Sequence, residues 1–224
     1  MKTKTLLPIA LAISLASFAP LATIAKENTL KANVPEQQFS PLSLSERESL
    51  LYMFEEEKLA RDVYQSLNSL WPSLIFTNIG QAEQRHMTQV KTLLSTYALI
   101  APVGSEQLGS FYNAQLAGLY TQLLERGRLS LVEALQTGAL IEETDIADLQ
   151  KASVEAQHAD IIQVYAHLLQ GSRNHLRAFV SQLQTQGIMY QAQHLSQAEV
   201  DAIVQSPFER GNGHGHGQGQ RGMR

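Results

Sequence analysis

Apolar residues recur every three or four positions from Leu42 onward, and this helical periodicity is the feature that most constrains the fold. No segment alternates apolar and polar residues as a half-buried strand would. Ser43 with Glu46, or Ser45 with Glu48, would form a capping box at the start of the first helix. The periodic segments predict four core helices and two short ones, over about residues 43–70, 77–97, 131–151 and 155–186, then 113–126 and a segment from Ser196. The sequence therefore predicts an all-α fold.

Five residues of types that bind metals fall inside the apolar stripes of the four core helices. Glu83 and His86 stand three apart and so share one face of the second helix. Glu57, Glu142 and His175 lie within the stripes of the first, third and fourth helices. A Glu-x-x-His pair that faces into a helical bundle is a ligand unit of di-iron and di-manganese carboxylate proteins. These five positions predict a metal centre, and a metal-free core in which the same side chains satisfy one another is the alternative.

The same periodicity assigns places to the neighbouring polar residues. Asp145 is one turn from Glu142 on the same face, so it is a further candidate metal ligand. Tyr64 lies two turns from Glu57 and is either a redox-active or hydrogen-bonding neighbour of the metals, or an ordinary core tyrosine. Glu143 is rotated by about 100° from Glu142 and is expected to be solvated or to support a ligand. Four further residues point away from the stripes and are expected at the surface: Glu55, Glu56, His158 and His167.

The ends of the chain differ in composition from its middle. Lys2 and Lys4 precede an uncharged apolar run, which is the pattern of a secretory signal peptide. An uncleaved membrane anchor is the alternative. The expected location is the periplasm or outside the cell, with no membrane span after cleavage. The expected organisation is a signal peptide, a polar leader, a helical domain and a disordered Gly/His-rich tail, over residues 1–25, 26–42, 43–206 and 207–224.

Composition excludes several classes of protein. The chain has no cysteine, which rules out disulfides, thiolate metal sites and a cysteine nucleophile. Cleavage after Ala25 would leave 15 basic and 21 acidic side chains, a formal net charge of −6 that does not favour nucleic acid or an anionic membrane surface. Neither a Gly-rich phosphate loop nor a nucleophile elbow occurs in the sequence. His214 and His216 in the tail offer only a loose pair of cation ligands.

The segments around the candidate ligands resemble those of known proteins. The stretch Glu57–Tyr64 is similar to the first-helix signature of rubrerythrin-type ferritin-like proteins, and Glu83–His86 to their second-helix ligands. With Glu142–Ile146 and Gly171–Phe179, the chain is identified as a member of the ferritin-like family known as domain of unknown function 2202. The resemblance implies a ferritin-like four-helix bundle with one long crossover and short accessory helices. It also implies a metal site, but no established reaction.

One position departs from the full di-iron pattern, because Ser172 stands where a glutamate would be. Two divalent ions carry four positive charges, whereas Glu57, Glu83 and Glu142 supply only three negative ones. An excess buried charge is costly unless it is compensated. Asp145 or a bridging hydroxide would supply the fourth negative charge, or a single metal ion binds.

Carboxylate and imidazole ligands suit iron, with manganese and zinc as alternatives. The expected function is that of an oxidoreductase with two iron ions that acts on peroxide, dioxygen or ferrous iron. Because the chain has no cysteine for a rubredoxin-type iron centre, it would need an external electron donor or ferrous iron itself as the substrate. The alternatives are a non-catalytic metal-binding protein of the cell envelope and a structural bundle with a degenerate site. A homo-oligomer is compatible with the sequence.

Overall fold

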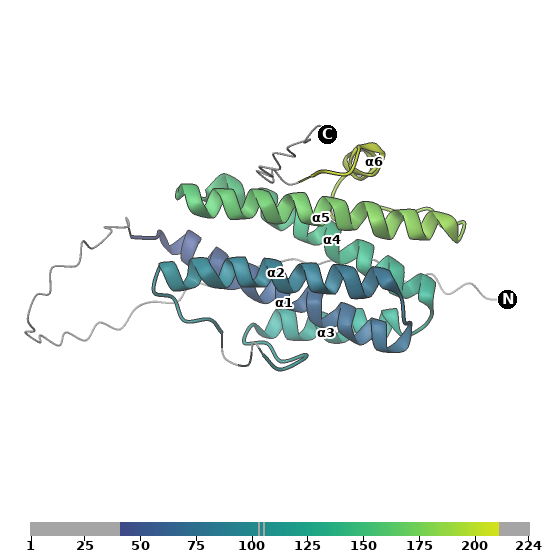
Figure 1. The fold of residues 1–224 in the computed structure, drawn as a ribbon, viewed down its shortest axis with the longest axis horizontal. Helices are drawn as coiled ribbons and strands as arrows, with labels where there is room; N and C mark the ends of the chain where they lie inside the picture. Colours follow the sequence, from purple (N-terminus) through teal and green to yellow (C-terminus); the bar gives the residue numbers. More distant parts are fainter. Residues whose placement is uncertain (1–40, 103, 105, 211–224) are drawn as a thin grey trace, which may run out of the picture. The chain divides into compact units, whose positions relative to one another are not determined.

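The computed structural model describes residues 41–102, 104 and 106–210, and this part of the chain contains six helices and no strands (Figure 1). The predicted all-α fold is therefore confirmed for the described residues. No helix among them combines the length and the apolar character that a membrane span needs. The predicted signal peptide, His214 and His216 lie outside the described residues. The helices are α1 (Leu44–Leu70), α2 (Leu74–Thr96), α3 (Ala114–Gly127), α4 (Leu131–Glu155), α5 (Ala159–Thr185) and α6 (Gln197–Gln205).

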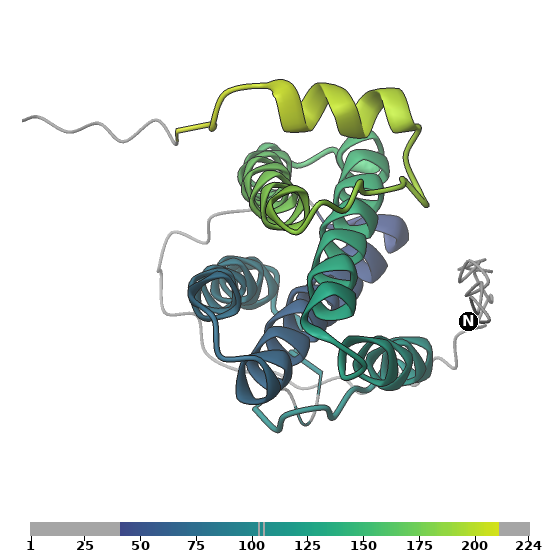
Figure 2. The same cartoon turned by 90° about the vertical axis from the view of Figure 1, so that its right-hand side faces the viewer.

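Four long helices pack as two pairs, α1 with α2 and α4 with α5. The pairs meet where α1 contacts α4 and where α2 contacts α5. The shorter helices lie outside, with α3 against α1 and α4, and α6 across α5 (Figures 1 and 2). Because the connection between α2 and α3 is long, α2 and α4 run in the same direction. Inward-facing residues at the same level of the four long helices therefore meet in the interior.

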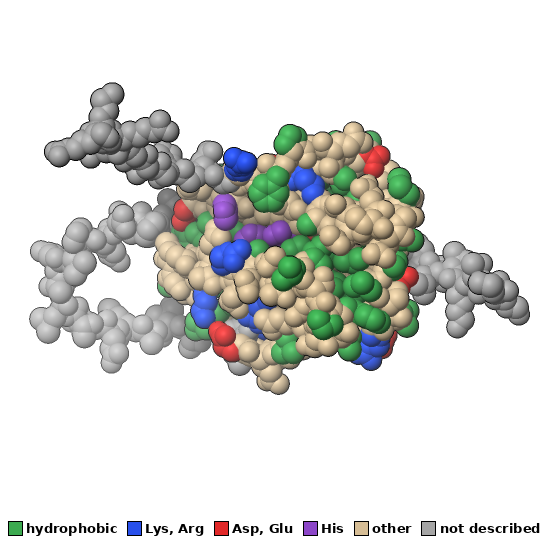
Figure 3. Space-filling view, turned by 45° about the vertical axis from the view of Figure 1, so that its right-hand side comes forward, with side chains coloured by type: hydrophobic (Ala, Val, Ile, Leu, Met, Phe, Trp, Pro, Cys, Tyr) green, Lys and Arg blue, Asp and Glu red, His purple; other side chains and the backbone are tan. Residues whose placement is uncertain are grey.

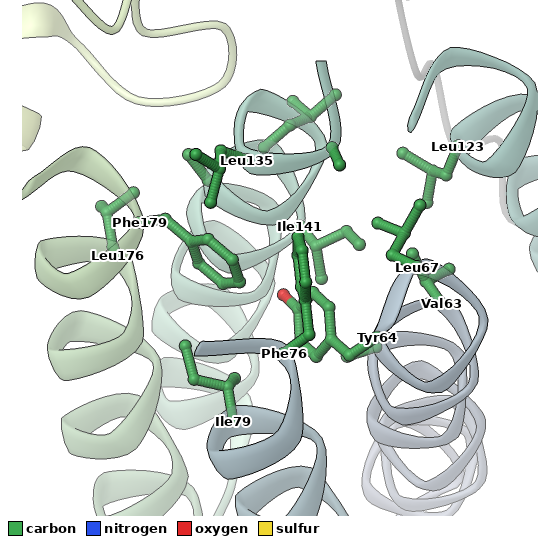
Figure 4. Close-up of a cluster of buried hydrophobic side chains, with 14 of the residues drawn as sticks. Val63, Tyr64, Leu67, Phe76, Ile79, Leu123, Leu135, Ile141, Leu176 and Phe179 are labelled. Carbon is green, nitrogen blue, oxygen red and sulfur yellow. The ribbon is translucent and has the colours of Figure 1, made fainter. Parts of the chain in front are cut away.

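Two hydrophobic clusters fill the interior and leave a polar layer between them. One cluster contains Tyr64, Phe76 and Phe179, whose rings pack against one another (Figure 4). The other contains Phe54 and Tyr165. Each long helix contributes to both clusters and passes through the layer in between. The apolar clusters thus fix the heights at which the polar side chains face one another.

Local sequence sets the start of α1 and of α6. Ser43 caps α1, accepting a hydrogen bond from the Glu46 amide while the Glu46 carboxylate accepts from the Ser43 amide. Of the two predicted capping boxes, the one at Ser43 is the one that forms. Ser196 and Glu199 make the same reciprocal pair at α6.

The predicted boundary between the third and fourth core helices, at residues 151–155, is wrong, because α4 runs to Glu155 and α5 begins only at Ala159. Glu46 of α1 determines the break. Its carboxylate accepts hydrogen bonds from the backbone amides of Gln157 and His158, at 2.8 and 3.0 Å. The His158 ring also lies 2.8 Å from Glu46 and is half-buried, so the prediction of a surface histidine there is wrong as well.

The prediction that Glu55 and Glu56 are solvated is also wrong, because every residue from Met53 to Tyr64 is buried. The connection between α2 and α3 covers this side of α1. Glu55 accepts hydrogen bonds from the backbone amides of Tyr112 and Asn113, at 2.5 and 2.9 Å. A helix covered on all sides has no solvated face, so its charged residues must find partners inside the protein.

Lys58 and Asp62 hold the same connection further along α1. The Lys58 ammonium donates to Asp62 and, at 2.8 Å, to the carbonyl of Gln107, and it lies 4.4 Å from the centre of the Phe111 ring. Asp62 accepts from the Gly109 amide at 2.9 Å. Lys58 and Asp62 therefore anchor the loop between α2 and α3 to α1.

Glu143 is buried rather than solvated, and it anchors the segment between α5 and α6. One carboxylate oxygen accepts from the backbone amides of Gln193, His194 and Leu195, at 2.6 to 2.7 Å. The other accepts from the Tyr190 hydroxyl at 2.5 Å. All hydrogen bonds of the Glu143 carboxylate among the described residues go to this loop, so Glu143 has a structural role away from the candidate ligands.

Candidate metal centre

The polar layer brings together the five candidate ligands that the sequence placed on inward faces. Glu57 comes from α1, Glu83 and His86 from α2, Glu142 from α4, and His175 from α5. Glu57 and Glu83 are fully buried, and the His175 side chain is 13 % exposed. The arrangement follows from the two hydrophobic clusters, which flank this layer on every long helix.

The five side chains form two triads that share Glu83. In the first triad, His86 Nδ1 lies 2.8 Å from Glu83 Oε2 and 3.3 Å from Glu57 Oε2. In the second, His175 Nδ1 lies 2.8 Å from Glu83 Oε1 and 3.3 Å from Glu142 Oε2. The ligand atoms of each triad lie within 4.8 Å of one another, so each triad could hold a metal ion. The two imidazole rings stack at 5.6 Å, and the triads are near copies of each other.

Most of these close contacts are not hydrogen bonds. A histidine nitrogen lies 2.8 Å from each oxygen of Glu83, yet neither oxygen has a hydrogen-bond partner among the described residues. His175 Nδ1, Glu57 Oε1 and Glu142 Oε2 are likewise buried without a partner there. Only His86 and Glu57 satisfy hydrogen-bond geometry. The donor atoms therefore crowd together without aligning on one another, as ligands directed at a common point would.

Burial and mutual charge set the protonation of this cluster. Burial opposes the charged form of Glu83, yet His175 and His86 outweigh it and hold the Glu83 pKa below its usual value. Burial raises the pKa of Glu57 to about 8 and that of Glu142 to about 7. Burial would lower the histidine pKa values, but the carboxylates reverse this and raise the pKa of His175 to about 10 and that of His86 as well. A cation that bound here would displace protons from the imidazoles.

Tyr64 and Asp145 border the triads. The Tyr64 hydroxyl donates to Glu142 Oε1 at 2.5 Å, which leaves Oε2 directed toward His175. Ser172 Oγ donates to Asp145 Oδ2 at 2.8 Å, while Asp145 Oδ1 is buried without a partner among the described residues. Asp145 is a member of neither triad. Its free oxygen makes it available as an additional ligand.

Gly171 is a residue of the centre that the sequence analysis did not single out. A Cβ atom at this position would lie 2.5 Å from His86 Cε1 and 2.6 Å from His86 Nε2. The missing side chain therefore lets α5 approach the His86 ring closely. A glycine inside a predicted helix, one turn before His175, was the available signal, because glycine disfavours helix interiors unless space requires it.

A second group of acids lies beside the centre, between α1 and α4. The Tyr52 hydroxyl lies 3.5 Å from Glu56 Oε1 and 3.4 Å from Asp148 Oδ2. Burial, followed by the charges of Asp145 and Asp148, raises the pKa of Glu56 well above its usual value. Sequence periodicity placed Glu56 on the solvent side of its helix, so this group was missed.

The histidine side of the centre faces the surface between α2 and α5. The His86 ring lies 6.1 Å from that of His167, which is exposed as predicted. The His86 ring in turn stacks on that of His175, so the three rings form a row. Figure 3 shows histidine side chains gathered in a hollow on one face. Near this face, Glu209 pairs with Arg173 and Arg177 and the Arg210 carbonyl accepts from Gln170, so Glu209 and Arg210 of the predicted tail contact α5.

The fold and the site define an all-helical protein with a buried carboxylate–histidine cluster that could hold metal ions. The chain belongs to the DUF2202 family, because the profile described as "Uncharacterized protein domain (DUF2202)" matches residues 46–207. The predicted membership of that family is thus confirmed.

A protein of Methanocaldococcus jannaschii is similar to this chain in both sequence and structure. The chain is 46 % identical over 180 residues to "Uncharacterized protein MJ0754" of Methanocaldococcus jannaschii, which covers 80 % of this chain and 96 % of the relative. The fold is similar to the crystal structure of hypothetical protein MJ0754 from the same organism, with a TM-score of 0.74 and 45 % identity over 80 % of this chain and 100 % of that one. The name of MJ0754 states no activity, so the function of this chain must be argued from the site.

Proposed function

We propose that this protein is a ferritin-like carboxylate protein with a two-metal centre, and that it acts as an oxidoreductase on peroxide, dioxygen or ferrous iron. The observation that carries the proposal is the position of Glu83, whose two oxygens each lie 2.8 Å from a different histidine. One carboxylate shared by two triads fits two metal ions with a common ligand. The four long helices each supply a ligand, and α1 and α5 run opposite to α2 and α4, which also fits a ferritin-like bundle.

The donor set fits iron. Glu57 and His86 would hold one ion, Glu142 and His175 the other, and Glu83 both. Oxygen and imidazole donors suit ferrous iron, with manganese and zinc as alternatives. When bound, an iron pair supplies two electrons to a small oxygen species.

Asp145 is the fourth carboxylate in this proposal. Three carboxylates leave two divalent ions with one uncompensated positive charge, and an uncompensated charge in the interior is costly. Asp145 Oδ1 is buried and unpartnered among the described residues, while Ser172 holds the other oxygen. Ser172, at the position where the full di-iron pattern has glutamate, would therefore orient a carboxylate that comes from α4.

Tyr64 would act as a positioning residue. Its hydroxyl fixes the rotamer of Glu142 through the 2.5 Å hydrogen bond and keeps one oxygen directed toward His175. The absence of cysteine from the chain means that electrons come from an external donor or from ferrous iron.

Metal stoichiometry is the test. The chain is loaded with ferrous iron without oxygen, with His214 and His216 changed to alanine so that the tail cannot add to the count. We expect two tightly held irons per chain and charge-transfer absorption after exposure to air or peroxide. The variant His175→Ala should lose both the absorption and at least one iron, whereas His167→Ala, an exposed histidine on the same helix, should retain them.

Other outcomes would replace the proposal. Metal uptake without consumption of oxygen or peroxide would leave a metal-binding protein with no redox activity. No tightly held metal would leave a structural bundle whose acids and imidazoles compensate one another.

Export to the periplasm or beyond is a separate part of the proposal, which rests on the first 25 residues of the sequence. N-terminal sequencing of the protein from cell-envelope fractions should find Lys26 first. An intact N-terminus would instead favour an anchor.

A further inference from the structure

The acids between α1 and α4 form a group separate from the two triads. Glu56 is 5 % exposed, and its Oε2 is buried without a hydrogen-bond partner among the described residues. Its other oxygen lies 3.5 Å from the Tyr52 hydroxyl, which also lies 3.4 Å from Asp148 Oδ2. Asp148 is only half-buried and so connects this group to the surface. One tyrosine hydroxyl therefore bridges a buried and an accessible carboxylate.

Asp145 connects the group to the centre. It precedes Asp148 by one turn on the same face of α4. Its own Oδ1 is also buried and unpartnered in the described part of the chain. The carboxylates whose charges act most strongly on Asp145 are Glu57, Glu142 and Glu83. A series of carboxylates therefore runs from Asp148 at the surface through Asp145 to the two triads.

None of the ion pairs found among the described residues joins a basic side chain to Glu56, Asp145 or Asp148. The charged residues that act most strongly on Glu56 are Asp145, Asp148 and Glu57, all acidic. The nearest basic residue along α1, Lys58, is directed to Asp62 and to the carbonyl of Gln107 instead. A buried acid without a basic partner is neutralised either by taking up a proton or by binding a cation.

We propose that Glu56 and Asp148 bind a third divalent cation, with the Tyr52 hydroxyl and water as the remaining oxygen ligands. We further infer that Asp145 passes such cations from this outer site to the two-metal centre. The passage rests on the proposed function, whereas cation binding at the outer site does not. Because the outer site offers no imidazole and only two carboxylates, it binds more weakly than the triads and exchanges its ion readily, as a delivery site requires.

Equilibrium dialysis against Mn²⁺, followed by metal analysis, tests the outer site. The full chain carries His214→Ala and His216→Ala in every sample. We expect three Mn²⁺ per chain, of which the weakest is lost in Asp148→Asn and weakened in Tyr52→Phe. Glu155→Gln removes an equal charge from an exposed position of α4 and should keep all three. Circular dichroism establishes whether each variant is folded. If Asp148→Asn is not folded, the weakened binding expected for Tyr52→Phe tests the outer site instead.

The rate of loading tests the passage. Anaerobic uptake of ferrous iron by the centre should slow at least tenfold in Asp148→Asn, while the final tight count stays at two. Equal rates in wild type and in Asp148→Asn would overturn the passage.

The two proposals fail in different ways. Two ions in both wild type and Asp148→Asn would overturn the outer site and leave the two-metal centre intact. One ion in wild type that is lost in Asp148→Asn but kept in His175→Ala would support the outer site and overturn the two-metal centre. Three ions in Asp148→Asn would also overturn the outer site, and no bound ion would overturn both.

Discussion

Gly171→Ala tests the packing that holds His86 in the centre. The added Cβ would lie 2.5 Å from His86 Cε1, and ordinary van der Waals contact begins at 3.4 Å. The imidazole would therefore have to withdraw by about 1 Å, which exceeds the tolerance of roughly 0.2 Å for a metal–ligand bond. Because His86 is buried between Glu57 and Glu83, it has little room for an equivalent position.

The expected loss is in metal affinity more than in folding. Alanine inside a helix gains about 1 kcal/mol over glycine, which offsets an overpacking cost of about 1–3 kcal/mol. The free energy of unfolding should then fall by no more than about 2 kcal/mol without metal. Affinity for the ion held by His86 should fall by roughly 10- to 100-fold, the loss typical of a disturbed ligand orientation.

Chelator competition with Mn²⁺ measures the affinity, and urea denaturation measures the stability. Gly118→Ala is the matched control, because it lies in a helix with nothing within 4 Å of the added Cβ. That variant should be slightly more stable than wild type and bind metal equally well. A folded Gly171→Ala protein that holds both ions with wild-type affinity would refute the reasoning.

Each of three further predictions concerns one buried polar side chain. Tyr64→Phe removes the hydrogen-bond donor to Glu142 and should lower the unfolding free energy of the metal-free protein by about 1.5–3 kcal/mol. Urea denaturation measures this, and a variant as stable as wild type would contradict the prediction. Glu143→Gln should lower the unfolding free energy by about 2–3 kcal/mol, because contacts with the loop between α5 and α6 are lost, and should leave metal affinity unchanged. Weakened metal binding would contradict the structural role given to Glu143. The folded-state pKa of Glu46 is lowered to about 2, because hydrogen bonds from His158 and backbone amides outweigh burial. This depressed pKa contributes stability above an unfolded pKa of about 4.5, and the contribution, about 1–2 kcal/mol after solvent screening, is lost as the pH falls from there toward about 2. Glu46→Gln should flatten that part of the stability profile, and an acid transition identical to wild type would argue against it.

Sequence predicts this fold well where local contacts decide the structure. The capping box at Ser43 lies within a few residues of the helix start that it sets, so that start was placed closely. The break between α4 and α5 was misplaced because its cause is remote. Glu46, more than a hundred residues earlier in the chain, accepts the amides of Gln157 and His158.

The candidate site was predictable for a related reason. Periodicity places a residue on the inward or outward face of its own helix, and Glu57, Glu83 and His86 lay on inward faces. Periodicity does not predict burial correctly for a helix that is covered on all sides. Glu55 and Glu56 are buried only because a distant segment and a second helix cover the far side of α1, which no pattern within the helix records.

The buried acids divide into two kinds by what their oxygens contact. One set accepts backbone N–H groups and ties together segments that are distant in the sequence: Glu46, Glu55, Asp62 and Glu143. A second set has a buried oxygen with no partner among the described residues: Glu56, Glu57, Glu83, Glu142 and Asp145. A buried polar atom without a partner costs about 1–3 kcal/mol, so native proteins keep few of them. A bundle kept only for structure needs acids of the first kind alone. The concentration of the second kind between two apolar clusters is therefore the strongest argument that this layer binds cations.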